Sequence, residues 1–225
     1  PLTLDGRFAN NGWLQELPKP LSKVTWDAIA YISLATAQGL GVKTTRVGNG
    51  DVDVIEVAYR GRTLRLPVWI LPGTADDTVI VHFGYGRRRS GRVGTGLGTD
   101  AFPLRTSTAP WFDGGATVTR TDQAYPIAST QNHFSMEGRH PVRVVGADEY
   151  RKDPASVAAL GHPAPPPEMS LYPAREYNGH KWGMAIDLNA CNGCGVCVAA
   201  CVAENNIPVV GKNQVMRSRE MHWIR

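Results

Sequence analysis

The four cysteines of this chain all lie in one short run, CNGCGVCVAAC, at residues 191–201. Their spacing is C-x2-C-x2-C-x3-C, formed by Cys191, Cys194, Cys197 and Cys201. In bacterial ferredoxins with this spacing, three thiolates bind one [4Fe–4S] cluster and the fourth binds a second cluster. The run therefore predicts a binding site for [4Fe–4S] clusters, with all four cysteines as metal ligands.

The residues around the cysteines agree with this interpretation. Gly193 and Gly195 stand between ligands, where a side chain would hinder wrapping around a cluster and where glycine adopts positive φ at little cost. The ferredoxin run usually continues with proline, but Val202 stands here. We therefore expect a helix that continues past Cys201 and ends at the asparagines before Pro208. Cys201 would then lie on that helix and serve a second cluster.

Clustered thiols have two other common uses. Disulfide scaffolds distribute their cysteines through a small domain, unlike this single run. Structural zinc sites usually consist of two cysteine pairs separated by a longer loop, and residues 191–201 have no such gap. The spacing favours iron–sulfur, and zinc is the main alternative.

A second candidate site is the loop of residues 84–106, which is rich in glycine and arginine. Backbone N–H groups and guanidinium forks of such a loop can bind phosphate, although its GTGLGT segment lacks the dinucleotide-binding spacing. A surface loop with solvated or subunit-contacting arginines is an equally open alternative. The candidate cofactor-binding residues are Gly84, Gly86, Arg87, Arg88, Arg89, Gly91 and Arg92.

Composition limits the remaining function classes. The chain has 225 residues, 42% of them hydrophobic and 20% charged, which suits one or two globular domains. The net charge of +4 is only mildly basic, and the single dense basic run argues against nucleic acid as a partner. No apolar segment is as long as the roughly 20 residues of a transmembrane helix, and no signal peptide is visible. We expect an internal fragment of a longer protein, since the chain starts without methionine.

The elements before residue 131 predict a mainly β domain. We expect a strand at residues 28–32, a helix at 34–38 capped by Ser33, and a hairpin at 51–70 with its turn at Arg60–Gly61. In the hairpin, Val52, Val54 and Val57 alternate with polar residues on one strand, and Leu64, Leu66 and Val68 alternate on the other. Further strands are expected at 78–83 and 116–121, and closure into a barrel is expected.

The remaining chain predicts a linker and part of a second domain. Residues 131–180 include a proline-rich run at 162–177 and are interpreted as an extended linker. Strands are expected at 181–188, 207–210 and 220–225 around the cysteine loop and its helix, as half of a ferredoxin-like unit. The six histidines lack ligand spacing and are expected to be surface or packing residues. No nucleophile motif or acid–base pair is present.

Three segments together resemble the iron–sulfur subunit of alternative complex III, a molybdopterin-oxidoreductase-like protein with a Tat signal. They are NNGWLQELPKPLSKVTWDAIAYIS, HFGYGRRRSGRVGTGLGTDAFPLR and AIDLNACNGCGVCVAACVAENNIPVVGKNQVMRSREMHWIR. The resemblance implies an α+β chain with three parts: a double-psi-barrel-like domain at 1–130 related to molybdopterin-dinucleotide-binding domains, a linker at 131–180, and a truncated 4Fe-4S ferredoxin-like domain at 181–225.

The resemblance also implies a function. It predicts an electron-transfer subunit, not catalytic on its own, of a membrane-associated respiratory complex that oxidises quinol. Its partners would be a quinol-binding membrane subunit and cytochrome c subunits, on the periplasmic side of the bacterial inner membrane. Molybdopterin is not expected, and the loop at 84–106 would be a relic. A true molybdopterin oxidoreductase and a zinc-containing scaffold are the competing hypotheses.

Overall fold

A computed structural model describes residue 3 and residues 5–43, 48–133, 135–161 and 166–224. The fold is α+β, as predicted. The chain forms two compact units, one made of Pro1–Asn132 with Asn192–Arg225 and the other of His133–Cys191. The cysteine helix thus belongs to the same unit as the N-terminal sheet. The predicted domain boundaries at residues 130 and 180 stay predictions.

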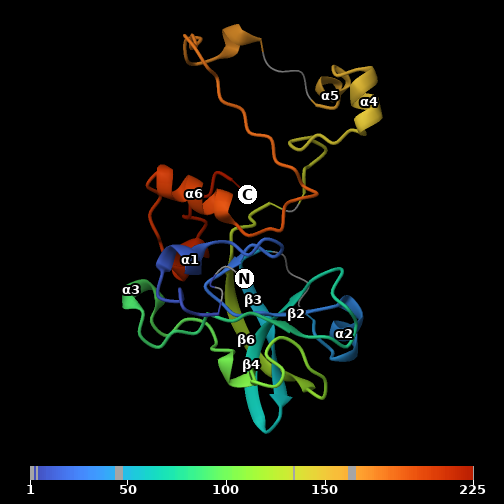
Figure 1. Ribbon diagram of the computed structural model, residues 1–225, viewed down its shortest axis with the longest axis vertical. Helices are drawn as coiled ribbons and strands as arrows, with labels where there is room; N and C mark the ends of the chain where they lie inside the picture. Colours follow the sequence, from blue (N-terminus) through green and yellow to red (C-terminus); the bar gives the residue numbers. More distant parts are fainter. Residues whose placement is uncertain (1–2, 4, 44–47, 134, 162–165, 225) are drawn as a thin grey trace. The chain divides into compact units, whose positions relative to one another are not determined.

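The first unit contains a curled six-stranded sheet with the strand order β1-β6-β3-β4-β2-β5 (Figure 1). All neighbouring strands are antiparallel except β2 and β4, which are parallel. The strands are β1 Val24–Thr25, β2 Ala30–Ile32, β3 Gly50–Tyr59, β4 Arg62–Ile70, β5 Ile80–Val81 and β6 Thr117–Ser129. The helices of this unit are α1 Gly12–Glu16, α2 Leu34–Gly39, α3 Gly91–Gly94, η1 Phe102–Leu104, α6 Val196–Glu204 and α7 Lys212–Val215.

The predicted hairpin is confirmed. Strands β3 and β4 pair with Tyr59 opposite Arg62, and the two turn residues Arg60 and Gly61 have φ values of 47° and 73°. Positive φ at both central residues matches the right-handed twist of the strands that the turn joins. Glycine fits the second position without strain, which explains why the chain reverses there.

The predicted helix cap is confirmed as well. Ser33 precedes α2, and its Oγ accepts a hydrogen bond from the Thr36 backbone N–H at 3.0 Å. This bond satisfies one of the N–H groups that have no partner within the first turn. The strand before the cap begins at Ala30 rather than at residue 28.

The middle of β3 is buried on both faces, which corrects the expected alternation along this strand. Ile55 and Val57 pack in one apolar cluster, while Val52 packs in another with Tyr31 and Trp69. A strand covered on both faces carries apolar residues at successive positions, so Ile55 is fully buried although the sequence pattern did not select it. The hairpin's inward residues therefore do not share one face.

Two other strands differ in length from the prediction. The strand expected at 78–83 is reduced to β5, whereas the strand expected at 116–121 extends to the 13 residues of β6. The pairing of β3 with β6 shifts between Asp53, opposite Ala124, and Ile55, opposite Arg120. Extra residues in β6 therefore bend the strand, as β-bulges do, and the long strand can pair with both β3 and β1.

The strands expected around the cysteines are absent from the described residues. Residues 181–188, 207–210 and 220–224 are not in strands, and Arg225 lies outside the described residues. Alternating apolar residues form a strand only when a neighbouring strand pairs with them, and Trp182 and Leu188 are instead 95% and 80% exposed. The double-psi barrel and the ferredoxin-like domain stay predictions.

The second unit has little regular structure. It contains the short helices α4 Ala147–Lys152, α5 Ser156–Ala159 and η2 Pro167–Met169 (Figure 1). Most of its described side chains are exposed, including Leu171 at 95%. The first residues of the proline-rich run, 162–165, lie outside the described residues, and the rest form η2 and irregular chain.

Candidate metal centre

The cysteine run has the local geometry that its glycines predict. Gly193 and Gly195 have φ values of 69° and 77°, so both occupy the left-handed region that glycine adopts without strain. The Asn192 side-chain Oδ1 accepts a hydrogen bond from the Cys194 backbone N–H at 3.2 Å. These features turn the chain sharply just before α6, which begins after Gly195.

Helix α6 carries the last two cysteines. It continues past Cys201 to Glu204, as Val202 in place of proline predicts, and Asn206 ends it with a φ of 50°. Cys197 and Cys201 are four residues apart and lie on the same side of the helix. The Asn205 Nδ2 donates to the Cys201 carbonyl at 2.9 Å and lies 3.5 Å from the Cys201 Sγ.

None of the four thiols forms a disulfide. Cys191, Cys194 and Cys197 are exposed, and Cys201 is half-buried. Thiolates are the ligands of both iron–sulfur clusters and structural zinc, so the donor chemistry fits either group. In the part of the chain that the structure describes, no three His, Cys, Asp or Glu side chains converge into a metal site. The assignment of the cysteines as ligands stays a prediction.

The loop of residues 84–106 folds back on itself through its glycines. Gly84, Gly86 and Gly91 have φ values between 78° and 87°. A Cβ on Gly86 would lie 2.1 Å from the Asp100 backbone N, so no larger residue fits there. Arg87 pairs with Leu97 in an isolated β-bridge, and its Nε donates to the Asn10 Oδ1 at 2.9 Å. Arg87 is therefore a structural residue of the loop.

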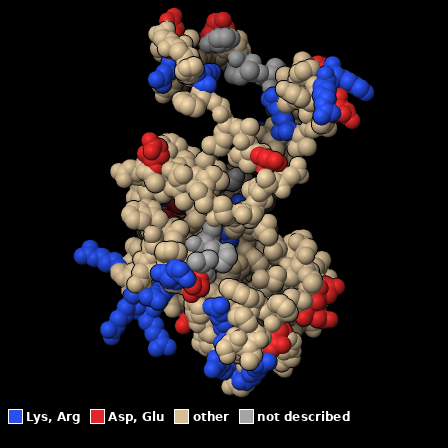
Figure 2. Space-filling view, in the orientation of Figure 1, with Lys and Arg blue, Asp and Glu red and all other residues tan. Residues whose placement is uncertain are grey.

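The other candidate arginines point outward. Arg88, Arg89 and Arg92 are exposed, and within the described residues no salt bridge involves them. Figure 2 shows basic side chains extending from the side of the molecule where Figure 1 places α3. The structure thus separates Arg87 from these three, and binding of an anion by the loop stays a prediction.

A half-buried histidine, His82, packs against an aromatic ring, as expected for a packing residue. His82 lies edge-on to the Tyr31 ring at a centroid distance of 4.7 Å, and its Nδ1 lies 3.2 Å from the Ile29 carbonyl oxygen. Burial and the nearby charge of Lys19 lower the pKa of His82 to about 3. His82 is therefore neutral at physiological pH.

Sequence reasoning missed a group of buried charged residues beside the segment that follows α6. The side chains of Glu16, Lys19, Asp27 and Lys212 are all buried, with Lys212 the most exposed of them at 6%. Burial raises the pKa of both carboxyl groups. Hydrogen bonds lower the pKa of Glu16 again in part, and the nearby charge of Lys212 does the same for Asp27. Burial also lowers the pKa of Lys212, and it lowers that of Lys19 to about 7. Only the density of lysine and proline around Lys19 marks this region in the sequence.

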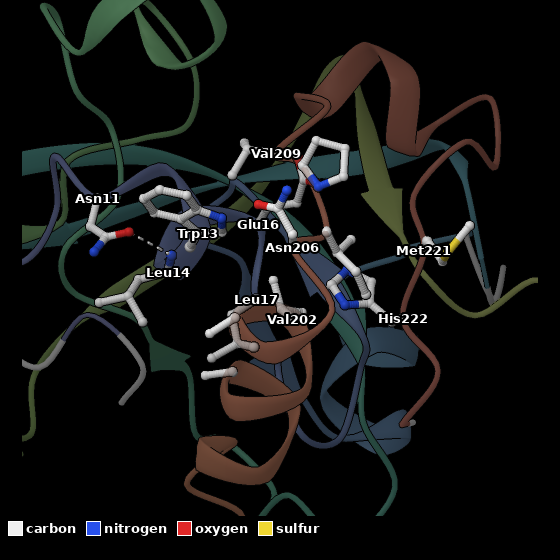
Figure 3. A pocket seen from close by; sticks show the side chains of 14 residues that line it. Asn11, Trp13, Leu14, Glu16, Leu17, Val202, Asn206, Val209, Met221 and His222 are labelled. Atoms are coloured by element: carbon white, nitrogen blue, oxygen red, sulfur yellow. Dashed lines mark hydrogen bonds between the residues drawn. The ribbon is translucent and has the colours of Figure 1, made fainter.

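An apolar hollow of about 430 Å³ lies between α1 and α6 (Figure 3). Asn11 caps α1 by accepting from the Leu14 backbone N–H at 3.3 Å, and Val202 is the buried residue of α6. The lining residues are Asn11, Trp13, Leu14, Glu16, Leu17, Ala199, Val202, Ala203, Asn206, Ile207, Pro208, Val209, Met221 and His222. The hollow thus shows that α1 and the cysteine helix are neighbours.

No described helix is both long enough and apolar enough to cross a bilayer.

Comparison with known proteins finds short similarities to subunits of reductases, and no protein-family profile matches the chain. The iron–sulfur cluster-binding subunit of menaquinone reductase from Nitratidesulfovibrio vulgaris is 70% identical over 27 residues, which are 12% of this chain and 11% of that protein. A subunit of tetrathionate reductase from Archaeoglobus fulgidus is 53% identical over 32 residues, 14% of this chain and 16% of that protein.

A third relative is the arsenate respiratory reductase iron–sulfur subunit ArrB from Chrysiogenes arsenatis. It is 62% identical over 26 residues, which are 12% of this chain and 87% of that sequence. All three are subunits of reductases, and two are named as iron–sulfur subunits. These similarities support an iron–sulfur subunit in general terms and do not single out alternative complex III.

Proposed function

We propose that this chain is part of an electron-transfer iron–sulfur subunit of a respiratory oxidoreductase complex. The observation that carries the proposal is the C-x2-C-x2-C-x3-C run, with its glycines at positive φ and its last two cysteines on one side of α6. The names of the three relatives support the same class. A bound [4Fe–4S] cluster would supply one-electron transfer, and Cys191, Cys194, Cys197 and Cys201 would hold it or share it with a second cluster.

The finer form of the proposal follows from the resemblance to alternative complex III. In that form the complex oxidises quinol and passes electrons to a periplasmic acceptor. The chain lies peripherally on the periplasmic side of the inner membrane and contacts a quinol-binding membrane subunit and cytochrome c subunits. The sheet of the first unit then serves as a scaffold, and molybdopterin is absent.

The second candidate is the iron–sulfur and pterin part of a true molybdopterin oxidoreductase. The glycine-rich loop at 84–106 favours it, because Gly91 has positive φ and open space around it, so that a phosphate can approach the backbone there. Metal analysis of the purified full-length protein distinguishes the two. Molybdenum in near-stoichiometric amount supports the molybdoenzyme, and iron without molybdenum supports the electron-transfer subunit.

The experiment that tests the proposal is anaerobic reconstitution of the chain with iron and sulfide. Iron and sulfide bound per chain, absorbance at about 400 nm and the EPR spectrum of the reduced sample establish the type of centre. Zinc bound in place of iron, with no such absorbance, would contradict the proposal. Cys201→Ser should leave a centre on the other three cysteines if Cys201 serves a second cluster. Complete loss of the centre would show that all four close on one.

A further inference from the structure

A buried carboxylate of α1 binds the backbone that follows the cysteine helix. The Glu16 Oε2 accepts from the Gly211 N–H at 2.7 Å, and its Oε1 accepts from the Val210 N–H at 3.0 Å. The Trp26 indole Nε1 donates to the Glu16 Oε2 at 3.1 Å. Glu16 is only 4% exposed, so these three N–H donors replace the water that an ionised carboxylate would otherwise bind.

A second buried carboxylate binds the next residue of the same segment. The Lys212 Nζ lies 2.8 Å from the Asp27 Oδ2, and both side chains are buried. The Tyr125 hydroxyl donates to the Asp27 Oδ1 at 2.8 Å, and its ring centroid lies 4.0 Å from the Lys212 Nζ. The Lys19 Nζ donates to the Asp27 carbonyl oxygen at 2.6 Å. Asp27 thus joins three parts of the chain.

Apolar and amide contacts hold the end of this segment. Val215 is fully buried in a cluster with Trp26 and Ala128. The Asn49 Nδ2 donates to the Val215 carbonyl at 3.3 Å, and the Asn49 Oδ1 accepts from the Ser129 N–H at 2.7 Å. Residues 210–215 are therefore fixed at one end to α1 and Asp27, and at the other end to Trp26, Asn49 and β6.

Only a short connection separates this fixed segment from the thiols. The Ile207 N–H donates to the Val202 carbonyl at 2.9 Å, which closes the chain back onto α6 directly after the turn at Asn206. Val202 and Ile207 are both buried, at 9% and 7% exposure. A short segment bonded to α6 thus connects residues 210–212 to the helix that carries Cys197 and Cys201.

We infer that Glu16 and Asp27 are positioning residues for the metal centre: they bind residues 210–212 and so fix the cysteine helix in one orientation. The inference deepens the proposed function and rests on it. Buried ionic groups are weak evidence for stability, because apolar residues of the same volume often stabilise as well. Such groups instead favour one arrangement of the chain, because a buried carboxylate needs its hydrogen-bond donors in fixed positions.

The test is binding of Co²⁺ alone to the fully reduced chain under anaerobic conditions. Co²⁺ bound by thiolates gives charge-transfer and d–d absorption bands, whose intensities report the coordination geometry. Glu16→Gln puts an amide NH₂ among N–H donors, and Asp27→Asn removes the charge that pairs with Lys212. We expect both variants to bind Co²⁺ about tenfold more weakly, as changes to residues that orient ligands do, and with altered d–d bands.

Three further variants separate positioning from general destabilisation. Ile55→Val loosens the core of the sheet without touching residues 210–212. Glu56→Gln removes a half-buried carboxylate whose oxygen lies 2.9 Å from the Arg65 side chain. Both should bind Co²⁺ like the wild type. Lys212→Met replaces Asp27→Asn as a test of the ion pair if the latter does not fold, and it should weaken Co²⁺ binding similarly.

Two results would overturn the inference. One is folded Glu16→Gln and Lys212→Met variants with wild-type Co²⁺ affinity and bands. The other is a wild-type chain with no thiolate bands, because then no thiols are positioned for metal. Failure of the proposed function looks different: the wild type would bind Co²⁺ in the positioned geometry, and the variants would weaken it, but iron and sulfide would form no cluster.

Discussion

Replacing Lys19 by methionine tests the cost of burying an amine in the first unit. Lys19 is 2% exposed; its Nζ donates to the Asp27 carbonyl at 2.6 Å and lies 3.9 Å from the centre of the Tyr85 ring. Methionine has a similar length and no charge, so the variant keeps the volume and removes the titration.

The magnitude follows from the pKa of the amine. Burial lowers the pKa of Lys19 from 10.5 to about 7, so between these values the unfolded chain binds more protons than the folded one. Stability must then rise with pH across this window. With about 1.36 kcal/mol for each unit of pKa difference, the Lys19 contribution rises by about 3 kcal/mol between pH 7 and pH 9.5.

The assay is urea unfolding of both proteins at pH 7 and pH 9.5, followed by tryptophan fluorescence. Lys212 also has a lowered pKa, so the Lys19→Met variant retains part of the pH dependence. The quantity to compare is therefore the difference in free energy of unfolding between wild type and variant. This difference should change by about 3 kcal/mol between pH 7 and pH 9.5. Equal pH dependence in wild type and variant would refute a buried, neutralised Lys19.

Three substitutions and one control, Gly91→Ala, test local features by the midpoint of urea unfolding. Ser33→Ala removes the cap that binds the Thr36 N–H at 3.0 Å and should cost about 1 kcal/mol; an unchanged midpoint would contradict a role for the cap. Gly86→Ala places a Cβ 2.1 Å from the Asp100 N at a φ of +79° and should cost more than about 2 kcal/mol, whereas Gly91→Ala, with open space around it, should cost less. Leu66→Ala opens a cavity at a fully buried position and should cost about 2–5 kcal/mol; a smaller loss would indicate that the core collapses around it.

Structural features that depend only on residues close together in the sequence could be predicted. The hairpin turn at Arg60–Gly61, the Ser33 cap and the helix that carries Cys201 all depend on neighbouring residues, and the structure confirms each. The prediction of a strand at 181–188 was wrong. Alternation of apolar and polar residues shows which side chains would share a face, but it does not show whether another strand pairs with the segment.

The buried charges could not have been found in the same way. Glu16 and Asp27 meet their partners across 194 and 185 residues of chain, and a lone glutamate or aspartate in a sequence is usually a solvated surface residue. Their function depends on which distant backbone lies against them. The four cysteines differ from these charges, because their spacing in the sequence is enough to predict that they bind a metal.

The bond between Glu16 and Gly211 has a consequence for the order of assembly during protein synthesis. Its two ends are 195 residues apart, so the ribosome makes the whole sheet, including β1 and its partner β6, before the donor to Glu16 exists. At about 5–20 residues per second, roughly ten seconds or more separate the two ends. The bond that fixes the segment after α6 can therefore form only after the chain of the whole sheet has been made, and under the proposed function this interval leaves the thiols of α6 accessible for cluster assembly.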